Sequence, residues 1–398
     1  MENVYAIGLM SGTSADGIDA CAVEITDCTR RRIRMNCLAF HTYAYPKGLQ
    51  AELLELGARG SVAQLCTYNV LLGQLFAEAA LDIARRARLR MEDVFVVGSH
   101  GQTVYHAPDE REVHGRRVRA TLQIGDPSVI AVTCRATTVG DFRVADVAAG
   151  GQGAPLVPYF DLQIFGRNLN DGEVVLLLNV GGICNVTALI RNDSKTEVVA
   201  FDCGPGNMVI DGLMQDLFDE PFDRNGQMAA KGKVVRDLLV WMCNDPFLQR
   251  RPPKSTGREM YGKDYRMQLH KKAQQLNVSN EDFIATATEF TVEAVRSNYD
   301  SFLKPKLENN EGTLRRLLVS GGGVHNTQIL RHLTTKFSEY KVGTTDDEGI
   351  NSDAKEAMCF AYLAYQTLKG NQTNLPDVTG ATEPVLLGKI CPVLTPAT

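Results

Sequence analysis

The sequence lacks the features that mark membrane-spanning, secreted and metal-thiolate proteins. No apolar run approaches the roughly 20 residues that a helix needs to cross a bilayer. The ten cysteines show no CxxC pair and no cysteine–histidine ligand spacing, so they predict neither a disulfide framework nor a zinc site. The chain opens on an expected strand rather than on a signal peptide. We therefore expect reduced thiols and a cytoplasmic location.

An excess of charge of one sign is also missing. The 42 lysines and arginines are balanced by 47 aspartates and glutamates, and a net charge of −5 gives no sign of nucleic-acid binding. A short basic cluster at residues 30–34 is best explained as a solvated hairpin tip. Hydrophobic and charged contents of 44% and 22% are typical of a globular enzyme, and 398 residues suffice for two domains.

The two commonest nucleotide-binding loops are absent, but the chain begins with a glycine-rich turn of another kind. Residues 8–19 lie between two apolar runs, 4–7 and 20–25, that resemble strands. No Gly-Lys-Ser/Thr ending is present and no helix follows the glycines, which excludes a Walker loop and a dinucleotide fingerprint. The stretch instead predicts a β-hairpin whose glycines allow close approach of a ligand and whose N–H groups and hydroxyls can hold an anion.

Two carboxylates in this turn, Asp16 and Asp19, would repel a phosphate unless a cation such as Mg²⁺ lies between them. The pattern is therefore typical of a hairpin that grips a nucleotide triphosphate. An ordinary hairpin with a long polar turn remains the alternative, because glycine- and serine-rich turns are common.

Glycine turns recur in the second half of the chain. Residues 174–178 predict a buried strand, 179–182 a turn and 185–190 a returning strand, which repeats the order of the opening hairpin. Three successive glycines at 321–323 separate an expected strand at 314–319 from a helix, and such a turn lets a flat or charged ligand come close.

Three further segments carry candidate functional side chains. Asp202 follows an expected strand and precedes a helix, a placement that suits either a general base or a helix cap. His100 follows an expected strand at 94–98 and either lines a site or is a hydrogen-bonded structural histidine. Residues 150–158, with three glycines and two prolines, form either the wall of a cleft or a plain linker.

A rigid basic loop is expected over residues 252–259, which begin with two adjacent prolines. This loop lies either on the surface or over an anionic ligand. The sequence alone leaves both interpretations open.

Taken in order, these segments resemble the actin-like ATPase architecture of sugar kinases, actin and heat-shock ATPases. More specifically, they resemble the 1,6-anhydro-N-acetylmuramic acid kinases of cell-wall recycling. The matching segments follow the family's order over almost the whole chain and are residues 8–19, 99–103, 140–143, 150–158, 179–185, 202–207, 253–259, 320–326 and 355–357. Each is weak alone, but the whole set in register is highly specific.

The resemblance implies an α/β, two-domain actin-like ATPase or sugar kinase fold with a central cleft. We expect domain I to comprise residues 1–140 plus 376–398 and to carry the first phosphate hairpin. Domain II is expected to comprise residues 141–375, with the second phosphate hairpin and an adenosine-binding turn.

The resemblance also implies an ATP- and Mg²⁺-dependent kinase. Its reaction is hydrolysis of the 1,6-anhydro bridge of anhydro-N-acetylmuramic acid with phosphorylation of the 6-oxygen, which gives N-acetylmuramic acid 6-phosphate. Water is the nucleophile and needs one carboxylate as base, for which Asp202 is expected. Asp16 and Glu356 are the expected metal ligands, and Arg143 would hold the sugar or the departing bridge oxygen. Internal ion pairing is the alternative for Arg143 and Glu356.

The expected binding residues fall into two sets. The ATP-binding set is Gly12, Thr13, Ser14, Ala15, Asp16, Gly17, Ile18, Asp19, Gly181, Gly182, Gly204, Gly321, Gly322, Gly323 and Asn326. The substrate-binding set is His100, Arg143, Gln152, Gly153, Ala154, Pro155 and Glu356. A small anhydrosugar is the implied partner, with neither nucleic acid nor membrane. A homodimer is implied by the resemblance only.

Cys184 and Cys203 depart from the family, in which alanine and threonine are expected. Cys203 adjoins Asp202 and cannot hydrogen-bond as a hydroxyl does, which bears on the orientation of that carboxylate. Gly151 and Pro158 match the muramic-acid kinases rather than the related levoglucosan kinases, where an arginine tends to replace the second glycine. A levoglucosan kinase with the same chemistry is one alternative. An actin-like nucleotide-binding regulator without a sugar substrate is another.

Overall fold

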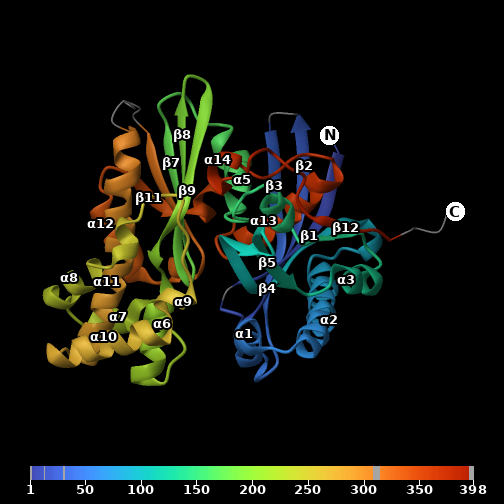
Figure 1. The fold of residues 1–398 in the computed structure, drawn as a ribbon. Helices are drawn as coiled ribbons and strands as arrows, with labels where there is room; N and C mark the ends of the chain where they lie inside the picture. Colours follow the sequence, from blue (N-terminus) through green and yellow to red (C-terminus); the bar gives the residue numbers. More distant parts are fainter. Residues whose placement is uncertain (1, 13, 30–31, 308–313, 394–398) are drawn as a thin grey trace. The chain divides into compact units, whose positions relative to one another are not determined.

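A computed structural model describes residues 2–12, 14–29, 32–307 and 314–393. Thr13 of the expected ATP site, and Arg30 and Arg31 of the basic cluster, lie outside the described residues. The chain divides into two compact units (Figure 1). Unit 1 comprises Met1–Ile164 and Ala354–Thr398, and unit 2 comprises Phe165–Asp353. Within the described ranges, no helix is long and apolar enough to cross a membrane.

Unit 1 is built on one mixed sheet with the strand order β12-β6-β4-β1-β2-β3, and β5 pairs with β4 outside this path. Its strands are β1 (Glu2–Ser11), β2 (Gly17–Thr29), β3 (Arg32–Ala44), β4 (Val94–Val113), β5 (Arg116–Ile124), β6 (Thr138–Gly140) and β12 (Lys389–Cys391). Its α-helices are α1 (Leu49–Arg59), α2 (Val62–Arg86), α3 (Pro127–Cys134), α4 (Val144–Ala148), α5 (Val157–Asp161), α13 (Lys355–Leu368) and α14 (Pro376–Thr379). Ser61 caps α2 through a capping box with Gln64.

Unit 2 contains a five-stranded sheet with the order β11-β10-β7-β8-β9. Its strands are β7 (Val174–Val180), β8 (Ile183–Asn192), β9 (Lys195–Pro205), β10 (Arg315–Ser320) and β11 (Lys341–Thr344). Its α-helices are α6 (Asn207–Phe218), α7 (Gln227–Lys231), α8 (Arg236–Cys243), α9 (Arg258–Tyr261), α10 (Lys263–Gln275), α11 (Asn280–Asn298) and α12 (Thr327–Lys336). Short 3-10 turns also occur, including Pro246–Gln249 and Gly322–His325.

The two units share one strand topology. In unit 1, β1, β2 and β3 form an antiparallel meander, and β4 and β6 add in parallel beside β1. In unit 2, β7, β8 and β9 form the meander, and β10 and β11 add in parallel beside β7. The sequence echo between the two glycine hairpins therefore reflects a repeated α/β topology. The α/β, two-domain fold implied by the resemblance is confirmed.

Helix α13 packs directly on β1 and β4 of unit 1. A Cβ atom on Gly8 would lie 1.8 Å from the carbonyl oxygen of Ala357, and one on Gly98 would lie 2.1 Å from that of Phe360. Two strand glycines thus allow the helix backbone to approach the sheet more closely than any side chain would permit.

This packing also sets the division between the units. The boundaries expected from sequence follow residues 140 and 375, whereas the structure changes unit after Ile164 and after Asp353. The difference arises because α4, α5 and α13 contact other elements of unit 1 rather than the sheet of unit 2. A local composition change near residue 150 does not reveal that long-range packing.

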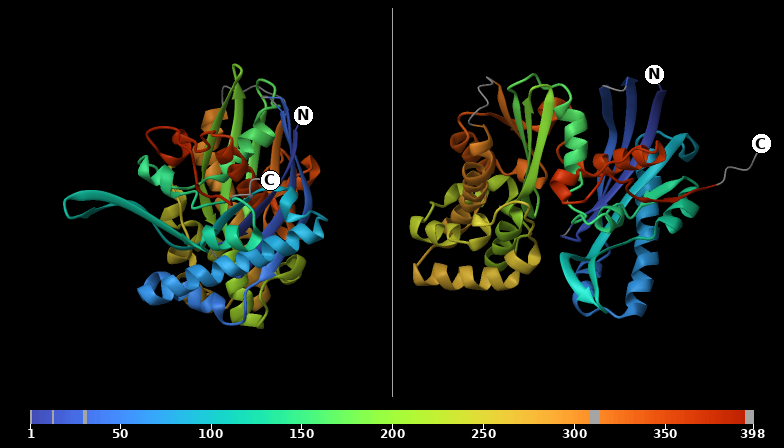
Figure 2. Two further views of the ribbon diagram at one scale, coloured as in Figure 1. Left: turned by 90° about the vertical axis from the view of Figure 1, so that its right-hand side faces the viewer. Right: turned by 45° about the horizontal axis from the view of Figure 1, so that its top comes forward.

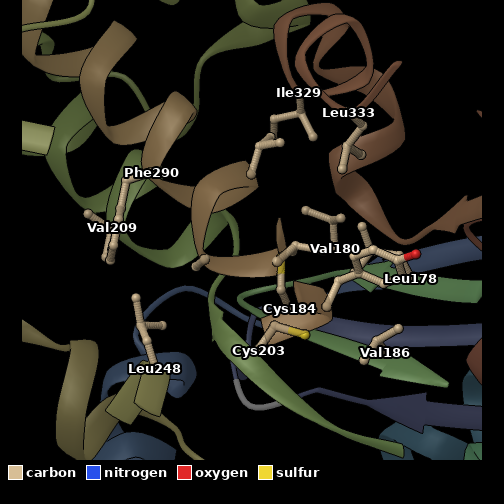
Figure 3. Packing of buried hydrophobic residues seen from close by; sticks show 14 of the residues in the cluster. Leu178, Val180, Cys184, Val186, Cys203, Val209, Leu248, Phe290, Ile329 and Leu333 are labelled. Atoms are coloured by element: carbon tan, nitrogen blue, oxygen red, sulfur yellow. The ribbon is translucent and has the colours of Figure 1, made fainter. Parts of the chain in front are cut away.

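The core of unit 2 lies between its sheet and helices α6, α11 and α12 (Figure 3). Cys184 and Cys203 are fully buried in this core, where a thiol packs as a small hydrophobic group. Their departure from the expected alanine and threonine is therefore tolerated by an apolar environment.

Strand β4 is much longer than the segment 94–98 that the sequence predicts. It runs on into residues 106–118, whose polar composition predicts a loop tip, and pairs with β5 as an antiparallel hairpin. Figure 2 shows the far part of this hairpin extending away from the sheet of unit 1. Most side chains near the end of the hairpin are exposed, so polar residues are accommodated there although the backbone forms paired β-strands.

Candidate functional site

The first glycine turn joins β1 to β2, as predicted, and side chains from other strands and loops hold its backbone. Ser11 Oγ lies 2.7 Å from the carbonyl oxygen of Gly17 and 2.7 Å from Oε1 of Gln102. The Tyr45 hydroxyl donates to Ser11 Oγ over 3.0 Å, and Gln102 Nε2 donates to the carbonyl of Gly12 over 3.1 Å. Ser11 and Gln102 are both buried and were not among the expected site residues.

The two carboxylates of this turn have different surroundings. Asp16 is exposed and its Oδ1 accepts a hydrogen bond from Ser14 Oγ over 2.9 Å. Asp19 is partly buried and its Oδ1 accepts one from Thr42 Oγ1 over 2.6 Å. No group of three or more His, Cys, Asp or Glu side chains that could hold a metal ion occurs in the described part of the chain. Mg²⁺ is commonly bound by one or two carboxylates together with substrate phosphates, so the exposed carboxylate of Asp16 could still be a Mg²⁺ ligand.

Two other expected ATP-binding residues point into the core. The side chains of Ala15 and Ile18 are buried in the hydrophobic cluster of unit 1, so only their backbone is available to a nucleotide. Gly12 is in open space, because a Cβ atom there would meet only Ser14 Oγ, at 3.8 Å. The crest of the turn is therefore its accessible part.

His100 is buried and acts as a hydrogen-bond acceptor. Arg143 Nε donates to His100 Nε2 over 3.0 Å. On the other side of the ring, Nδ1 donates to the carbonyl of Gly101 over 2.9 Å, which assigns the neutral tautomer with its proton on Nδ1. Burial, together with the Arg143 cation, keeps the pKa of His100 well below its usual range. His100 therefore orients Arg143, and the structural interpretation left open by the sequence agrees with these contacts.

Arg143 is held at two of its nitrogens. Besides the bond to His100, Nη1 donates to the carbonyl of Gly153 over 2.7 Å. Burial lowers the pKa of Arg143 to about 10, while the Glu356 and Asp146 carboxylates favour its charged form. The guanidinium thus remains a cation at neutral pH, with its plane fixed by the protein.

Asp146 is a fully buried carboxylate that shapes the 150–155 loop. It accepts hydrogen bonds from Gly153 N over 2.8 Å, Asn374 Nδ2 over 2.8 Å and Thr379 Oγ1 over 2.7 Å. A Cβ atom on Gly151 would lie 2.1 Å from Asp146 Oδ2, so only glycine fits there. Loop and C-terminal segment are therefore joined around one carboxylate.

Sequence reasoning missed this hub as a functional element. The sequence clue was that Asp146 is the single carboxylate in the otherwise apolar helix α4. Such a residue is expected to be buried and to accept hydrogen bonds from protein donors. Gln152, an expected substrate residue, is also anchored through its backbone, because its N–H donates to the carbonyl of Thr379 over 2.8 Å. Asn374 and Thr379, the distant partners of Asp146, could not be recognised from the local sequence.

The second glycine turn joins β7 to β8 in unit 2. The carbonyls of Gly181 and Gly182 accept hydrogen bonds from the backbone N–H groups of Asn207 over 2.8 Å and Gly206 over 2.9 Å. The start of α6 is therefore docked against this turn. Gly204, at the end of β9 and shortly before α6, has φ +140°, and a Cβ atom there would lie 3.2 Å from Leu248 Cδ2.

The third glycine turn packs against the end of β7. Gly321 has φ +79°, and a Cβ atom on it would lie 2.5 Å from Asn179 Oδ1. One on Gly323 would lie 2.2 Å from Val180 Cγ1, whereas Gly322 has ordinary clearance. The second and third expected nucleotide turns thus lie side by side within unit 2.

Asn326, expected to bind ATP, caps helix α12. Its Oδ1 accepts from the N–H groups of Gln328 over 3.1 Å and Ile329 over 3.3 Å. That oxygen is occupied by the helix, which leaves the amide nitrogen as the group able to serve a ligand.

Asp202 lies within β9, which continues beyond it to Pro205. Its Oδ2 accepts a hydrogen bond from Thr256 N over 2.9 Å, and its own N–H donates to the carbonyl of Lys254 over 3.2 Å. Helix α6 has no side-chain cap, so the carboxylate does not act as a helix cap. Burial raises the pKa of Asp202 to about 7, against the opposing effects of the Thr256 N–H and the Lys254 ammonium. A carboxyl group that titrates near neutrality has the property required of a general base.

In the loop at 252–259, where Pro253, Ser255 and Glu259 are exposed, Lys254 departs from both sequence interpretations. Lys254 is buried, and its ammonium donates to the carbonyls of Phe247 and Leu248 rather than facing solvent or a ligand. An apolar enclosure within unit 2, invisible in the local sequence, draws this cation inward.

The family profile described as anhydro-N-acetylmuramic acid kinase matches residues 4–393. The chain belongs to the anhydro-N-acetylmuramic acid kinase family. It is 43% identical over 393 residues to the anhydro-N-acetylmuramic acid kinase of Caldanaerobacter subterraneus subsp. tengcongensis, with 98% of this chain and 97% of the relative covered. It is 43% identical over 387 residues to that of Salinibacter ruber, with 96% and 95% covered. It is 38% identical over 392 residues to that of Clostridioides difficile, with 98% of each covered.

In this member of the anhydro-N-acetylmuramic acid kinase family, the expected site residues are shared between the units. Unit 1 contains the first glycine hairpin, His100, Arg143, the 150–155 loop and Glu356. Unit 2 contains Asp202 and the second and third glycine turns.

Proposed function

We propose that this protein is an ATP-dependent kinase that hydrolyses the 1,6-anhydro bridge of anhydro-N-acetylmuramic acid and phosphorylates the 6-oxygen. The products are N-acetylmuramic acid 6-phosphate and ADP. The observation that carries the proposal is the carboxyl group of Asp202, whose pKa burial raises to about 7, in a chain that matches the kinase family over residues 4–393. The relatives' names supply the sugar.

Asp202 is proposed as the base that activates water. Its Oδ2 is occupied by the Thr256 N–H, so Oδ1 is the oxygen assigned to the water proton. The water oxygen bonds to the anomeric carbon, the bond from that carbon to the bridge oxygen breaks, and the freed 6-oxygen takes the γ-phosphoryl group of ATP. Proton transfer by a positioned carboxylate contributes roughly 10²–10⁴-fold to such a step.

The glycine turns are proposed to hold the nucleotide. The open crest of the first hairpin, at Gly12, and the turn at Gly181 and Gly182 suit phosphates, since their backbone permits close approach. The turn at residues 321–323 is assigned to adenosine. The exposed Asp16 carboxylate fits Mg²⁺, with Glu356 as the second expected ligand. When bound, the metal neutralises charge on the phosphates.

Arg143 and the 150–155 loop are proposed to bind the sugar. The neutral His100 ring and the Gly153 carbonyl fix two guanidinium nitrogens, and this leaves the fork in one orientation. A fixed cation can hold the sugar or the bridge oxygen as negative charge develops on it.

We further propose that the units correspond to the two functional domains of a cytoplasmic enzyme. Unit 1 acts as the domain with the first phosphate hairpin, and unit 2 as the domain with the second hairpin and the adenosine turn. The nine cysteines whose side chains the structure describes are free, which accords with a reducing compartment.

The proposal is tested by assaying the purified protein with ATP and Mg²⁺ on anhydro-N-acetylmuramic acid and on levoglucosan. We expect a 6-phosphorylated, ring-opened product and equimolar ADP from the first sugar, with much slower turnover of the second. Asp202→Asn should lose most turnover and still bind ATP, whereas Asp171→Asn, a surface control, should behave as wild type. A wild-type protein that binds ATP but phosphorylates neither sugar would instead support a nucleotide-binding regulator.

A further inference from the structure

Lys254 carries a buried charge that the proposed mechanism leaves unused. Its side chain is 8% exposed, and Nζ donates to the carbonyls of Phe247 over 3.1 Å and Leu248 over 3.2 Å. Both carbonyls belong to the 3-10 turn Pro246–Gln249, six and seven residues upstream. The ammonium therefore ties the 252–256 loop to that turn.

Three aromatic rings complete the enclosure of this ammonium. Nζ lies 4.7 Å from the ring centroid of Phe247, 5.0 Å from that of Phe302 and 5.8 Å from that of Phe201. Ring faces attract a cation, but burying an ammonium remains costly unless all its donors are satisfied. Burial accordingly lowers the pKa of Lys254 to about 8. An apolar side chain would fill the same space without this cost, so the charge itself calls for an explanation.

The loop that Lys254 anchors holds the proposed base at two atoms. The carbonyl of Lys254 accepts from Asp202 N over 3.2 Å, and Thr256 N donates to Asp202 Oδ2 over 2.9 Å. Lys254 and Thr256 thus flank the carboxylate, one through its backbone oxygen and the other through its amide.

The charges that face this pair come from several elements. Burial raises the pKa of Asp202, and the Lys254 ammonium opposes this rise because it favours the ionised carboxylate. The Glu259 carboxylate raises the pKa of Asp202 further. On Lys254, Asp202 and Asp245 favour the charged form and Arg250 disfavours it. The thiols of Cys203 on β9 and Cys184 on β8 adjoin the carboxylate in the apolar core.

We propose that Lys254 is a positioning residue for catalysis: its buried ammonium fixes the loop so that the Thr256 N–H occupies Oδ2 of Asp202 and Oδ1 is presented to water. The role rests on the proposed function of Asp202 and extends it to a residue whose ammonium is enclosed by two backbone carbonyls and three aromatic rings. It also accounts for the charge, because a cation beside the carboxylate favours its ionised, proton-accepting form.

Two variants separate the charge from the anchoring bonds. Lys254→Gln removes the charge but keeps an amide that can donate to the two carbonyls, whereas Lys254→Met removes both. Lys306→Met is the matched control, since Lys306 forms a surface pair with Glu197. The measurements are the pH profile of kcat/KM for the sugar, the Kd for ATP, and Tm.

For Lys254→Gln we expect the acid limb of the profile to move up by about 0.5–1 pH unit, with the ATP Kd unchanged. For Lys254→Met we expect the same shift and a further loss of about 10-fold in kcat, because Thr256 no longer holds Oδ2 firmly. The Lys306→Met profile should match that of wild type.

If the Lys254 variants lower Tm but keep the wild-type kcat and the wild-type acid limb of the kcat/KM profile, the positioning role is refuted and the kinase function is left intact. A wild-type protein that makes no sugar phosphate would refute the proposed function instead. In that case, the Asp202 carboxyl is titrated by ¹³C NMR in wild type and Lys254→Gln. A raised pKa in the variant supports the positioning contact, and an unchanged pKa refutes it.

Discussion

Nε of Arg143 donates to Nε2 of His100 across 3.0 Å, so a neutral imidazole is the acceptor that orients a half-buried cation. Nδ1 of the same ring donates to the carbonyl of Gly101, which fixes the tautomer. Protonation of His100 would place two positive charges at this contact, and burial already disfavours it. The pair therefore works only with the imidazole uncharged.

His100→Ala should impair use of the sugar more than use of ATP. Without its acceptor, the Arg143 fork keeps only the bond to Gly153 and samples other orientations. We expect kcat/KM for the sugar to fall by about 10- to 100-fold, the cost of misplacing one binding group. His114→Ala, in the tip of the β4–β5 hairpin, is the control. Equal losses of kcat/KM for the sugar and for ATP would argue against an orienting role.

The ionised form of Asp202 should cost stability at neutral and alkaline pH. Its pKa is raised to about 7 in the folded protein, so below about pH 4 both folded and unfolded states carry the proton. As pH rises from 4 to 7, the unfolded state loses its proton first, and the stability of the wild type falls. Asp202→Asn should therefore be more stable than wild type at pH 8, by on the order of 1–2 kcal/mol, and equal to it near pH 4. Thermal unfolding at the two pH values checks the sign. A variant that is less stable at pH 8 would contradict the assignment.

The acid limb of the wild-type activity profile should follow the same group. Because the base must be ionised, we expect kcat/KM to rise with pH, to reach half its maximum near the Asp202 pKa of about 7, and to level off roughly one pH unit higher. Steady-state kinetics from pH 5 to 9 with saturating Mg²⁺ and ATP measure this limb. A profile that is flat below pH 7 would exclude Asp202 as the base.

Asp146→Ala should destabilise unit 1 and disorder the sugar loop. The change leaves donors on Gly153, Asn374 and Thr379 buried without their acceptor, at a cost of about 3 kcal/mol. Asp146→Asn keeps one acceptor oxygen and should lose less. Tm and the KM for the sugar report the two effects. A normal KM in a destabilised Asp146→Ala protein would show that the loop keeps its shape without the carboxylate.

Gly8→Ala should be severely destabilising although it adds only one methyl group. Its Cβ would lie 1.8 Å from the carbonyl oxygen of Ala357, so α13 would have to move off β1. We expect a loss above about 3 kcal/mol, or no soluble protein. Gly370→Ala is the comparison, since its Cβ meets nothing within 4 Å and only its φ of +73° adds strain, worth about 1 kcal/mol. Similar Tm values for the two variants would contradict the close packing.

Features set by neighbouring residues could be predicted from the sequence. The apolar runs 4–7 and 20–25 on either side of residues 8–19 indicated the first hairpin, and the consecutive apolar residues 174–178 indicated the buried strand β7. The polar end of β4 was mistaken for a loop, because an exposed ladder has no apolar face to signal it.

The sequence by itself determined where the glycine turns lie and that Asp202 belongs near the end of a strand, since backbone freedom and side-chain periodicity are local properties. Only the tertiary structure decided that Lys254 turns inward, that His100 serves Arg143, and that α13 belongs with the sheet of unit 1. Each of these depends on burial and on partners distant in the chain. Charge and hydrogen-bonding state change when water is removed by packing, and no run of adjacent residues records that removal.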